Sequence, residues 1–154
     1  MSYDRIFNEM KDLNKNCSEG IMVTCDSDMY NWTCYISGPE GTSYETLTYE
    51  IEVIFRKSHP FKPPMLRFVT PMFHPNVSPN GSIWISLLHE RWSPVLTMKK
   101  ILMILRSILN DPEVNAIDEE HTHIVNKDAY KLWISNKDLY REYVKIWYNN
   151  NKPI

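Results

Sequence analysis

The sequence predicts an α+β domain: one helix, a four-stranded antiparallel meander, a long loop and then C-terminal helices. Three patterns indicate this order. Apolar residues recur at helical spacing near the N-terminus, alternate with polar residues through 48–55, and return to helical spacing after 97. No repeat or linker interrupts the 154 residues, so we expect a single domain over 1–154.

The first half of the chain is expected to form one helix and the sheet. Ile6, Phe7, Met10 and Leu13 share one helical face, which predicts a helix over residues 3–13. Four strands are predicted, in the segments GIMVT, NWTCYIS, TYEIEVIF and MLRFV. TYEIEVIF alternates apolar and polar residues most clearly, as a strand with one solvated face does. Short connections between successive strands favour an antiparallel meander.

Residues 69–96 are expected to form a long ordered loop. Prolines interrupt this segment at four places, Pro71, Pro75, Pro79 and Pro94. Proline lacks the backbone donor that a helix interior or a central strand needs, and no part of the segment reaches helix length. Loops of this length inside compact domains are often functional.

Three helices are expected after this loop. Thr97 is a suitable N-cap, and six apolar residues between 98 and 109 form one wide stripe that we assign to the core. Asp111-Pro112 ends this helix, because proline disfavours helical geometry in the residue before it. Shorter helical patterns follow around residues 125–135 and 137–149.

The composition is that of an ordinary globular protein, with 43% hydrophobic and 23% charged residues. A formal net charge of −2 gives no basic surface for nucleic acid and no polybasic membrane patch. No apolar run approaches the roughly 18 residues that a membrane span needs, and the N-terminal residues lack the features of a signal peptide. We therefore expect no nucleic acid, no membrane, and an intracellular protein that is cytoplasmic, with a nuclear location left open.

The cysteines and histidines do not indicate a metal site. Cys17, Cys25 and Cys34 are odd in number and contain no CxxC pair, which argues against both a disulfide framework and a zinc site. The HTH triplet at 121–123 has no thiol or third histidine nearby in the sequence. We expect no metal and no cofactor.

A series of short motifs makes the chain resemble the ubiquitin-conjugating (E2) family along residues 3–148. In chain order they are RIFNEMKDL, WTCYISGP, HPFKPP, HPN at 74–76, NGSI, RWSPVLT and LNDP. HPN alone is a weak signal, but HPN followed by NGSI and then WSP is a specific combination. The resemblance implies the ubiquitin-conjugating (UBC) fold and partners from that pathway: ubiquitin or a ubiquitin-like protein, a RING or HECT E3 ligase, an active E2, and an E1 activating enzyme.

Members of that family carry ubiquitin as a thioester on a cysteine and pass it to a lysine. The resemblance implies three features for this chemistry: a cysteine directly after NGSI, the HPN asparagine, which serves the oxyanion or holds the active-site loop, and acidic residues near the cysteine. His74, Pro75 and Asn76 match the HPN motif. The position of the family's cysteine, however, falls on Trp84.

Other positions of the acyl-transfer site also depart from the family pattern. Two residues beyond Trp84, where many members have aspartate, this chain has Ser86. After NDP, the position that often holds aspartate or serine aligns with Ala116, although Asp118 lies two residues further on. An indole N–H only donates a hydrogen bond, whereas an acyl carrier needs a thiolate or a comparable nucleophile. Ser86 is a weak substitute, because no base is evident beside it in the sequence.

Strand alternation predicts where Trp84 points. Asn80-Gly81 suits a tight turn, after which Ile83 and Ile85 would face the core while Trp84 and Ser86 face the opposite way. Trp84 is then expected at or near the surface, where it would cover part of the groove or anchor a partner. The alternative is that it fills space beneath the LLHERWSP segment.

The resemblance also implies a surface for ligases. Related active proteins meet RING or HECT ligases in this region, to which we assign Arg5, Phe61, Trp92, Ser93, Pro94 and Val95. The alternative is that Phe61 and Pro94 only shape their loops.

Three functions are open to such a chain. The favoured hypothesis is a catalytically inactive E2 variant, a pseudoenzyme that binds ubiquitin, an active E2 or an E3 ligase and modulates protein ubiquitination. The second is an active E2 with a displaced nucleophile, or one in which Trp84 stands in place of a working cysteine. The third is an interaction role unrelated to ubiquitin, because a fold alone does not determine a function.

Overall fold

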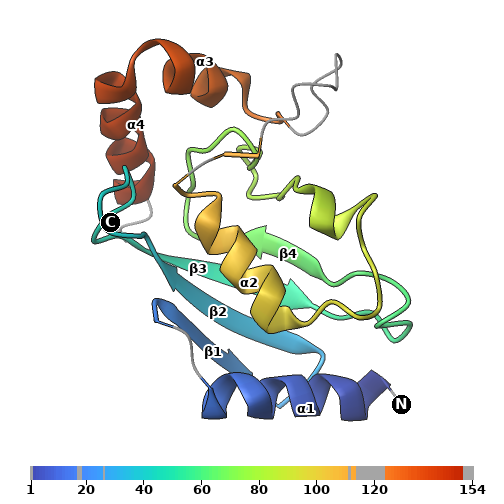
Figure 1. Ribbon diagram of the computed structural model, residues 1–154. Coiled ribbons are helices and arrows are strands. Elements are labelled where there is room, and N and C mark those ends of the chain that lie inside the picture. Colours follow the sequence, from blue (N-terminus) through green and yellow to red (C-terminus); the bar gives the residue numbers. More distant parts are fainter. Residues whose placement is uncertain (1, 17–18, 26, 111, 114–123, 151–154) are drawn as a thin grey trace.

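The chain has the α+β architecture that its sequence predicts (Figure 1). The computed structural model describes residues 2–16, 19–25, 27–110, 112–113 and 124–150. Its elements are α1 (Ser2–Lys15), β1 (Ile21–Cys25), β2 (Asn31–Ser37), β3 (Thr48–Ile54), β4 (Met65–Phe68), the 3-10 turn η1 (Ser86–Leu88), α2 (Met98–Ser107), α3 (Lys127–Ser135) and α4 (Lys137–Asn149). The helix, the strands and the later helices follow one another in the predicted order.

The four strands form one sheet in the order β1-β2-β3-β4, and every neighbouring pair is antiparallel. In β3, Tyr49, Ile51 and Val53 are fully buried, whereas Glu50 and Glu52 between them stay partly exposed. This period of two is what a sheet with one core face and one solvated face requires. The predicted meander is confirmed, and its apolar face forms one side of the core.

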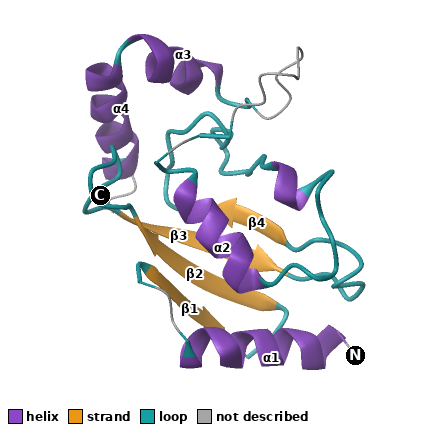
Figure 2. Cartoon of the chain, in the orientation of Figure 1, coloured by secondary structure: helices purple, strands orange, loops and turns teal. Residues whose placement is uncertain are grey.

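α2 covers the apolar face of the sheet, and α1 lies along the β1 edge (Figure 2). The buried residues of α2 belong to the predicted stripe: Met98, Ile101, Leu102 and Leu105. Thr97 caps the helix as predicted, because its Oγ1 accepts the Lys100 N–H at 3.2 Å. α2 thus begins where the long loop ends.

α3 and α4 pack on each other beyond one end of the sheet (Figure 1). Each begins with an asparagine cap: Asn126 Oδ1 accepts the Ala129 N–H, and Asn136 Oδ1 accepts the Leu139 N–H, both at 3.1 Å. Asn136 is the one residue between the two helices. Its cap therefore sets where the chain turns from α3 into α4.

A buried tyrosine pair attaches α4 to the rest of the fold. Tyr44, in the β2–β3 connection, donates through Oη to the Phe73 carbonyl at 2.6 Å, and the Tyr140 hydroxyl of α4 bonds to the same Oη. Burial raises the pKa of both hydroxyls well above the ordinary tyrosine value, so both stay protonated. The β2–β3 connection, the start of the long loop and α4 are therefore joined at one point.

Neither α1 nor any other helix in the described ranges combines the length and the apolar character of a membrane span. Within the same ranges, histidine, cysteine, aspartate and glutamate side chains do not gather in groups of three or more that could hold a metal ion. The HTH triplet at 121–123 lies outside the described residues.

Candidate functional site

A turn at Asn80-Gly81 attaches the long loop to the sheet. Gly81 adopts a φ of +94°, and its carbonyl accepts the Phe68 N–H of β4 at 2.9 Å. A Cβ at Gly81 would lie 2.2 Å from the Phe68 carbonyl oxygen, so glycine alone suits both the φ and the close approach. Asn80 Oδ1 accepts the Ser82 N–H at 3.0 Å. The predicted turn is confirmed, and it places the following residues beside β4.

Side chains alternate between core and surface after this turn, as predicted. Ile83 and Ile85 are buried, whereas Trp84 is 38% exposed. The Trp84 N–H donates to the Asn76 carbonyl at 2.8 Å, which fixes position 84 through the main chain. Ser86 differs from the expectation that it shares the exposed side with Trp84, because it is only 8% exposed. Ser86 begins η1, and the alternation of a strand ends there.

The Trp84 indole lines a groove and stacks on the His89 imidazole. The two ring centroids are 4.1 Å apart, and their planes differ by 14°. The groove has a volume of about 490 Å³. We call it the Trp84 groove; its lining residues are Arg56, Lys62, Pro63, Pro64, Met65, Leu66, Ser82, Ile83, Trp84, Leu88 and His89. The indole packs against the LLHERWSP segment and stays accessible, so both interpretations of its position hold in part.

His74 is fully buried and connects the HPN segment to the end of α2. Its Nε2 lies 2.7 Å from the Ile108 carbonyl at the end of α2, and its Nδ1 accepts the Asn76 N–H at 3.0 Å. A carbonyl can only accept, so Nε2 carries the proton and the ring is neutral. Burial lowers the pKa of His74 to about 4. Both ring nitrogens are therefore committed to backbone contacts.

Asn76 and Glu113 join three segments of the loop region. The fully buried Asn76 side chain donates through Nδ2 to the Glu113 carbonyl at 2.7 Å and accepts the Glu113 N–H through Oδ1 at 2.9 Å. Glu113 Oε1 in turn accepts the Ser86 N–H at 2.8 Å. The Pro75 carbonyl accepts the N–H groups of Val125 and Asn126 at 2.9 and 3.2 Å. These are the contacts of a loop-holding motif.

Sequence reasoning missed Glu113 and His89. No spacing or periodicity relates Glu113 to Asn76, since this pair forms through the tertiary fold. Trp84 and His89 stand on either side of the 3-10 turn η1, and the sequence pattern did not predict that turn. Ala116 and Asp118, the positions weighed for an acidic aid to catalysis, lie outside the described residues, as does Cys17.

The two cysteines that the structure describes belong to the sheet. Cys34 of β2 is fully buried, and burial raises the pKa of its thiol to about 12. Cys25 ends β1, which lies at the opposite edge of the sheet from β4. β4 is the strand beside the Trp84 segment, because its Arg67 pairs with Ser82. Three inter-strand spacings separate β1 from β4, or about 14 Å. Neither thiol stands beside the Trp84 groove.

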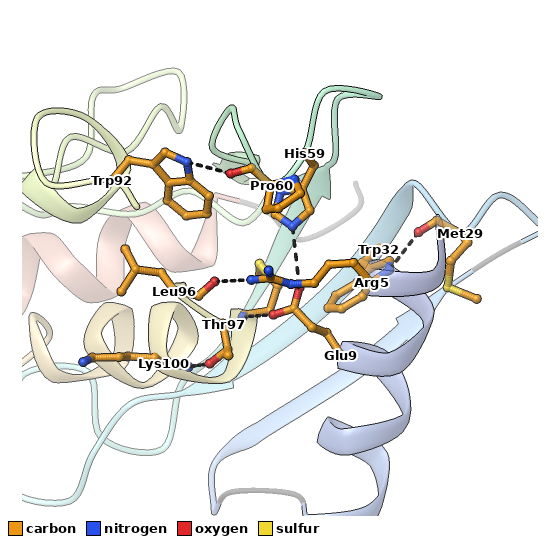
Figure 3. Close-up of polar contacts among 11 residues, drawn as sticks. Arg5, Glu9, Met29, Trp32, His59, Pro60, Trp92, Leu96, Thr97 and Lys100 are labelled. Carbon is orange, nitrogen blue, oxygen red and sulfur yellow. Dashed lines mark hydrogen bonds and ion pairs between the residues drawn. The ribbon is translucent and has the colours of Figure 1, made fainter. Parts of the chain in front are cut away.

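The residues assigned to a ligase surface belong to two loops and to α1. Figure 3 shows Trp92 of one loop beside Pro60 of the other, and Arg5 of α1 beside Leu96. Trp92 Nε1 donates to the Pro60 carbonyl at 3.1 Å and so joins the two loops. Phe61 is 79% exposed beside Pro60, and Val95 is 81% exposed on the other loop. We call the residues Phe61, Ser93, Pro94 and Val95 the Phe61–Val95 surface. High exposure shows that the Phe61 ring does little to pack its own loop.

Arg5 and Glu9 of α1 hold the two loops of this surface in place. Arg5 Nη2 donates to the Leu96 carbonyl at 2.9 Å, as Figure 3 shows. Glu9, which sequence reasoning did not select, is buried and accepts the Met98 N–H through Oε1 at 2.8 Å. Its Oε2 lies 3.4 Å from Arg5 Nε and 3.5 Å from His59 Nε2. α1 thus anchors the start of α2 and both loops.

Comparison with known proteins agrees with this architecture. The chain matches the family model described as "Ubiquitin-conjugating enzyme" over residues 5–148. It is similar to the "Ubiquitin-conjugating enzyme E2-18 kDa" of Schizosaccharomyces pombe, with 34% identity over 160 aligned positions that cover 94% of this chain and 92% of the relative. The α+β fold with its N-terminal helix, four-stranded sheet and C-terminal helices is the UBC fold. The chain belongs to the ubiquitin-conjugating enzyme (E2) family.

Proposed function

We propose that this E2 family member carries no thioester and instead binds ubiquitin, an active E2 or an E3 ligase, through which it modulates protein ubiquitination. The observation that carries this proposal is the indole of Trp84, which stands directly after NGSI, where the resemblance implies the family's cysteine. An indole offers a hydrogen-bond donor but no nucleophile, and acyl transfer needs a thiolate or an activated hydroxyl.

Neither cysteine in the described ranges is suited to act as the nucleophile in place of residue 84. Cys34 is buried with a pKa raised to about 12, and Cys25 lies at the far edge of the sheet from β4. The thiolate is the reactive form, so Cys34 holds almost none of it at neutral pH. A displaced cysteine nucleophile therefore finds no support in either residue.

One contact favours the alternative of an active E2 with a displaced nucleophile. Glu113 Oε1 lies 2.8 Å from the backbone nitrogen of Ser86, which brings a carboxylate close to a hydroxyl-bearing residue. Such a carboxylate could serve as the base that a serine nucleophile needs. Ser86 is only 8% exposed, however, so its hydroxyl is withdrawn from an incoming ubiquitin C-terminus.

A charging assay separates these functions. The wild-type chain, an E1 enzyme, ATP and ubiquitin are incubated, and adducts are resolved with and without reducing agent. The proposal expects no adduct. A thiol-sensitive adduct would refute it, and an adduct that resists thiol, is cleaved by alkali and disappears in Ser86→Ala would establish the oxyester alternative.

Trp84→Cys tests whether the rest of the acyl-transfer site is intact. The backbone at position 84 is held by Asn76, and the exposed indole stacks on the His89 ring. We therefore expect this variant to fold. A thiol-sensitive adduct in Trp84→Cys but not in Trp84→Ser would locate the loss of chemistry at this side chain.

Ligase binding is tested separately from charging. If the Phe61–Val95 surface contacts a ligase, the wild-type chain should compete with a charged active E2 for a RING domain. The double variant Phe61→Ala/Val95→Ala should no longer compete, because it removes the two apolar side chains of this surface. Both side chains are exposed, so their truncation should leave the fold intact. Ile134→Ala on α3, which is 64% exposed, is the matched control. Equal inhibition by the wild-type and double-variant chains would exclude this surface.

A further inference from the structure

A second groove lies between α4 and the β2–β3 connection, and it shares no lining residue with the Trp84 groove. Two adjoining hollows of about 400 and 430 Å³ share Gly41, Thr42, Ser43 and Arg141 as lining residues. Figure 1 shows the β2–β3 connection running beside α4. We call the joined hollow the α4 groove.

Three cations of α4 line this groove: Lys137, Arg141 and Lys145. A spacing of four residues places them on one helical face, with successive side chains about 6 Å apart along the axis. All three are exposed, and none forms an ion pair with another residue of the described ranges. Like charges at this spacing repel each other, so an anionic partner would relieve the repulsion.

The walls of the groove are fixed before any partner arrives. Tyr44 and Tyr140, which follow Ser43 and precede Arg141 in the chain, are hydrogen-bonded to each other in the core. Thr42 Oγ1 donates to the Pro39 carbonyl at 2.7 Å and accepts the Tyr44 N–H at 3.2 Å, which orders the connection. A partner would therefore meet preformed walls, and the cost of ordering on binding would be confined to the cationic side chains.

We propose that the α4 groove binds an extended acidic segment of a partner protein, with aspartate or glutamate at alternate positions. In an extended chain, alternate side chains point the same way and repeat at about 6.8 Å, close to the cation spacing of about 6 Å. The flexible lysine and arginine side chains absorb the difference. A single phosphate group is too small to reach three cations spread over about 12 Å of helix.

Trp133 and Glu45 refine this assignment. Lys137 Nζ lies 4.4 Å from the centre of the Trp133 ring, which holds that cation at one end of the groove. Glu45 lines the other end with Lys145 and is the one carboxylate among the lining residues. It should repel an acidic segment, so Glu45→Gln is expected to strengthen binding. A gain in affinity cannot result from misfolding.

The test uses the full chain and three fluorescein-labelled peptides of equal net charge in a polarisation titration. One peptide alternates glutamate with glycine, one groups its three glutamates, and one carries a phosphoserine and a glutamate. The alternating peptide should bind tightest. Lys137→Ala/Arg141→Ala/Lys145→Ala should weaken it on the order of tenfold, and Glu45→Gln should strengthen it about threefold.

The control triple variant Lys15→Ala/Lys57→Ala/Lys100→Ala removes the same charge from exposed positions elsewhere. It should leave the affinity within about twofold of the wild type. Equal weakening by both triple variants would reduce the effect to net charge and overturn the proposal. Tighter binding of the grouped or phosphorylated peptide would overturn the assignment of alternating carboxylates. Position 84 takes no part in these measurements, so their outcome is independent of charging.

Discussion

The stability of the long loop should depend on keeping His74 neutral. Burial lowers the pKa of this imidazole from 6.5 to about 4, because a charged ring would lose its hydration. Protonation would also convert Nδ1 from an acceptor into a donor facing the Asn76 N–H, 3.0 Å away. Acid should therefore break the contact between the His74 ring and the Asn76 N–H within the HPN segment.

The sign and size of the effect follow from the two pKa values. The unfolded chain binds a proton on this histidine near pH 6.5, and the folded chain does so only near pH 4, so the unfolded state holds more protons between these values. The free energy of unfolding therefore falls as the pH drops from 6.5 to 4. The full loss corresponds to about 3 kcal/mol, of which about 2 kcal/mol should occur between pH 7.5 and 5.

Urea unfolding of the wild type and of His74→Gln at pH 7.5 and 5 measures this term. Glutamine keeps a donor for the Ile108 carbonyl but does not titrate, so other ionisable groups cancel in the difference between the two proteins. The stability advantage of the wild type should shrink by about 2 kcal/mol at the lower pH. Equal m-values establish that both proteins unfold in the same way. A difference that does not change with pH would refute the assignment to His74.

Other contacts give further measurable outcomes. Asn76→Ala removes two hydrogen bonds between the buried Asn76 side chain and Glu113 and should lower the urea-derived stability by about 2–4 kcal/mol, whereas a loss below about 0.5 kcal/mol would contradict a loop-holding role. Glu9→Gln keeps an acceptor for the Met98 N–H but removes the negative charge at the start of α2, so it should cost about 1 kcal/mol and Glu9→Ala more. The Cys34 thiol, with a pKa raised to about 12, should be alkylated about a thousandfold more slowly in the native chain than in urea at pH 8, as peptide mass mapping can show. Equal rates in both states would mean that β2 is not packed as described.

The fold could be predicted because its determinants are local. The alternation in β3 distinguishes a strand with one wet face from a helix, and the Thr97 hydroxyl is positioned by its own place in the chain to cap α2. Element ends were harder to place. α3 begins at Lys127, two residues after the predicted start around 125, because Asn126 supplies the capping oxygen.

The site was predictable only as far as its main-chain geometry is local. The Asn80-Gly81 turn and the alternation of apolar residues after it predict Trp84 on the accessible side without any tertiary information, as its exposure confirms. Ser86 could not be placed in this way, because η1 ends the alternation and Glu113 binds the Ser86 N–H from a distant segment. The stack of Trp84 on His89 is local, but it depends on η1, which the sequence pattern did not predict.

Retention of the HPN triplet says little about activity, and the contacts explain why. Each residue of the triplet bonds to backbone groups of another segment. His74 bonds to Ile108, Pro75 to Val125 and Asn126, and Asn76 to Glu113. Those bonds hold the long loop to α2 and to the segment before α3 whether or not a nucleophile stands in front of them. An oxyanion donor acts only once a nucleophile has created the oxyanion. The HPN motif therefore predicts a folded loop in either case, and the charging assay on the wild type, Trp84→Cys and Ser86→Ala decides between the proposed functions.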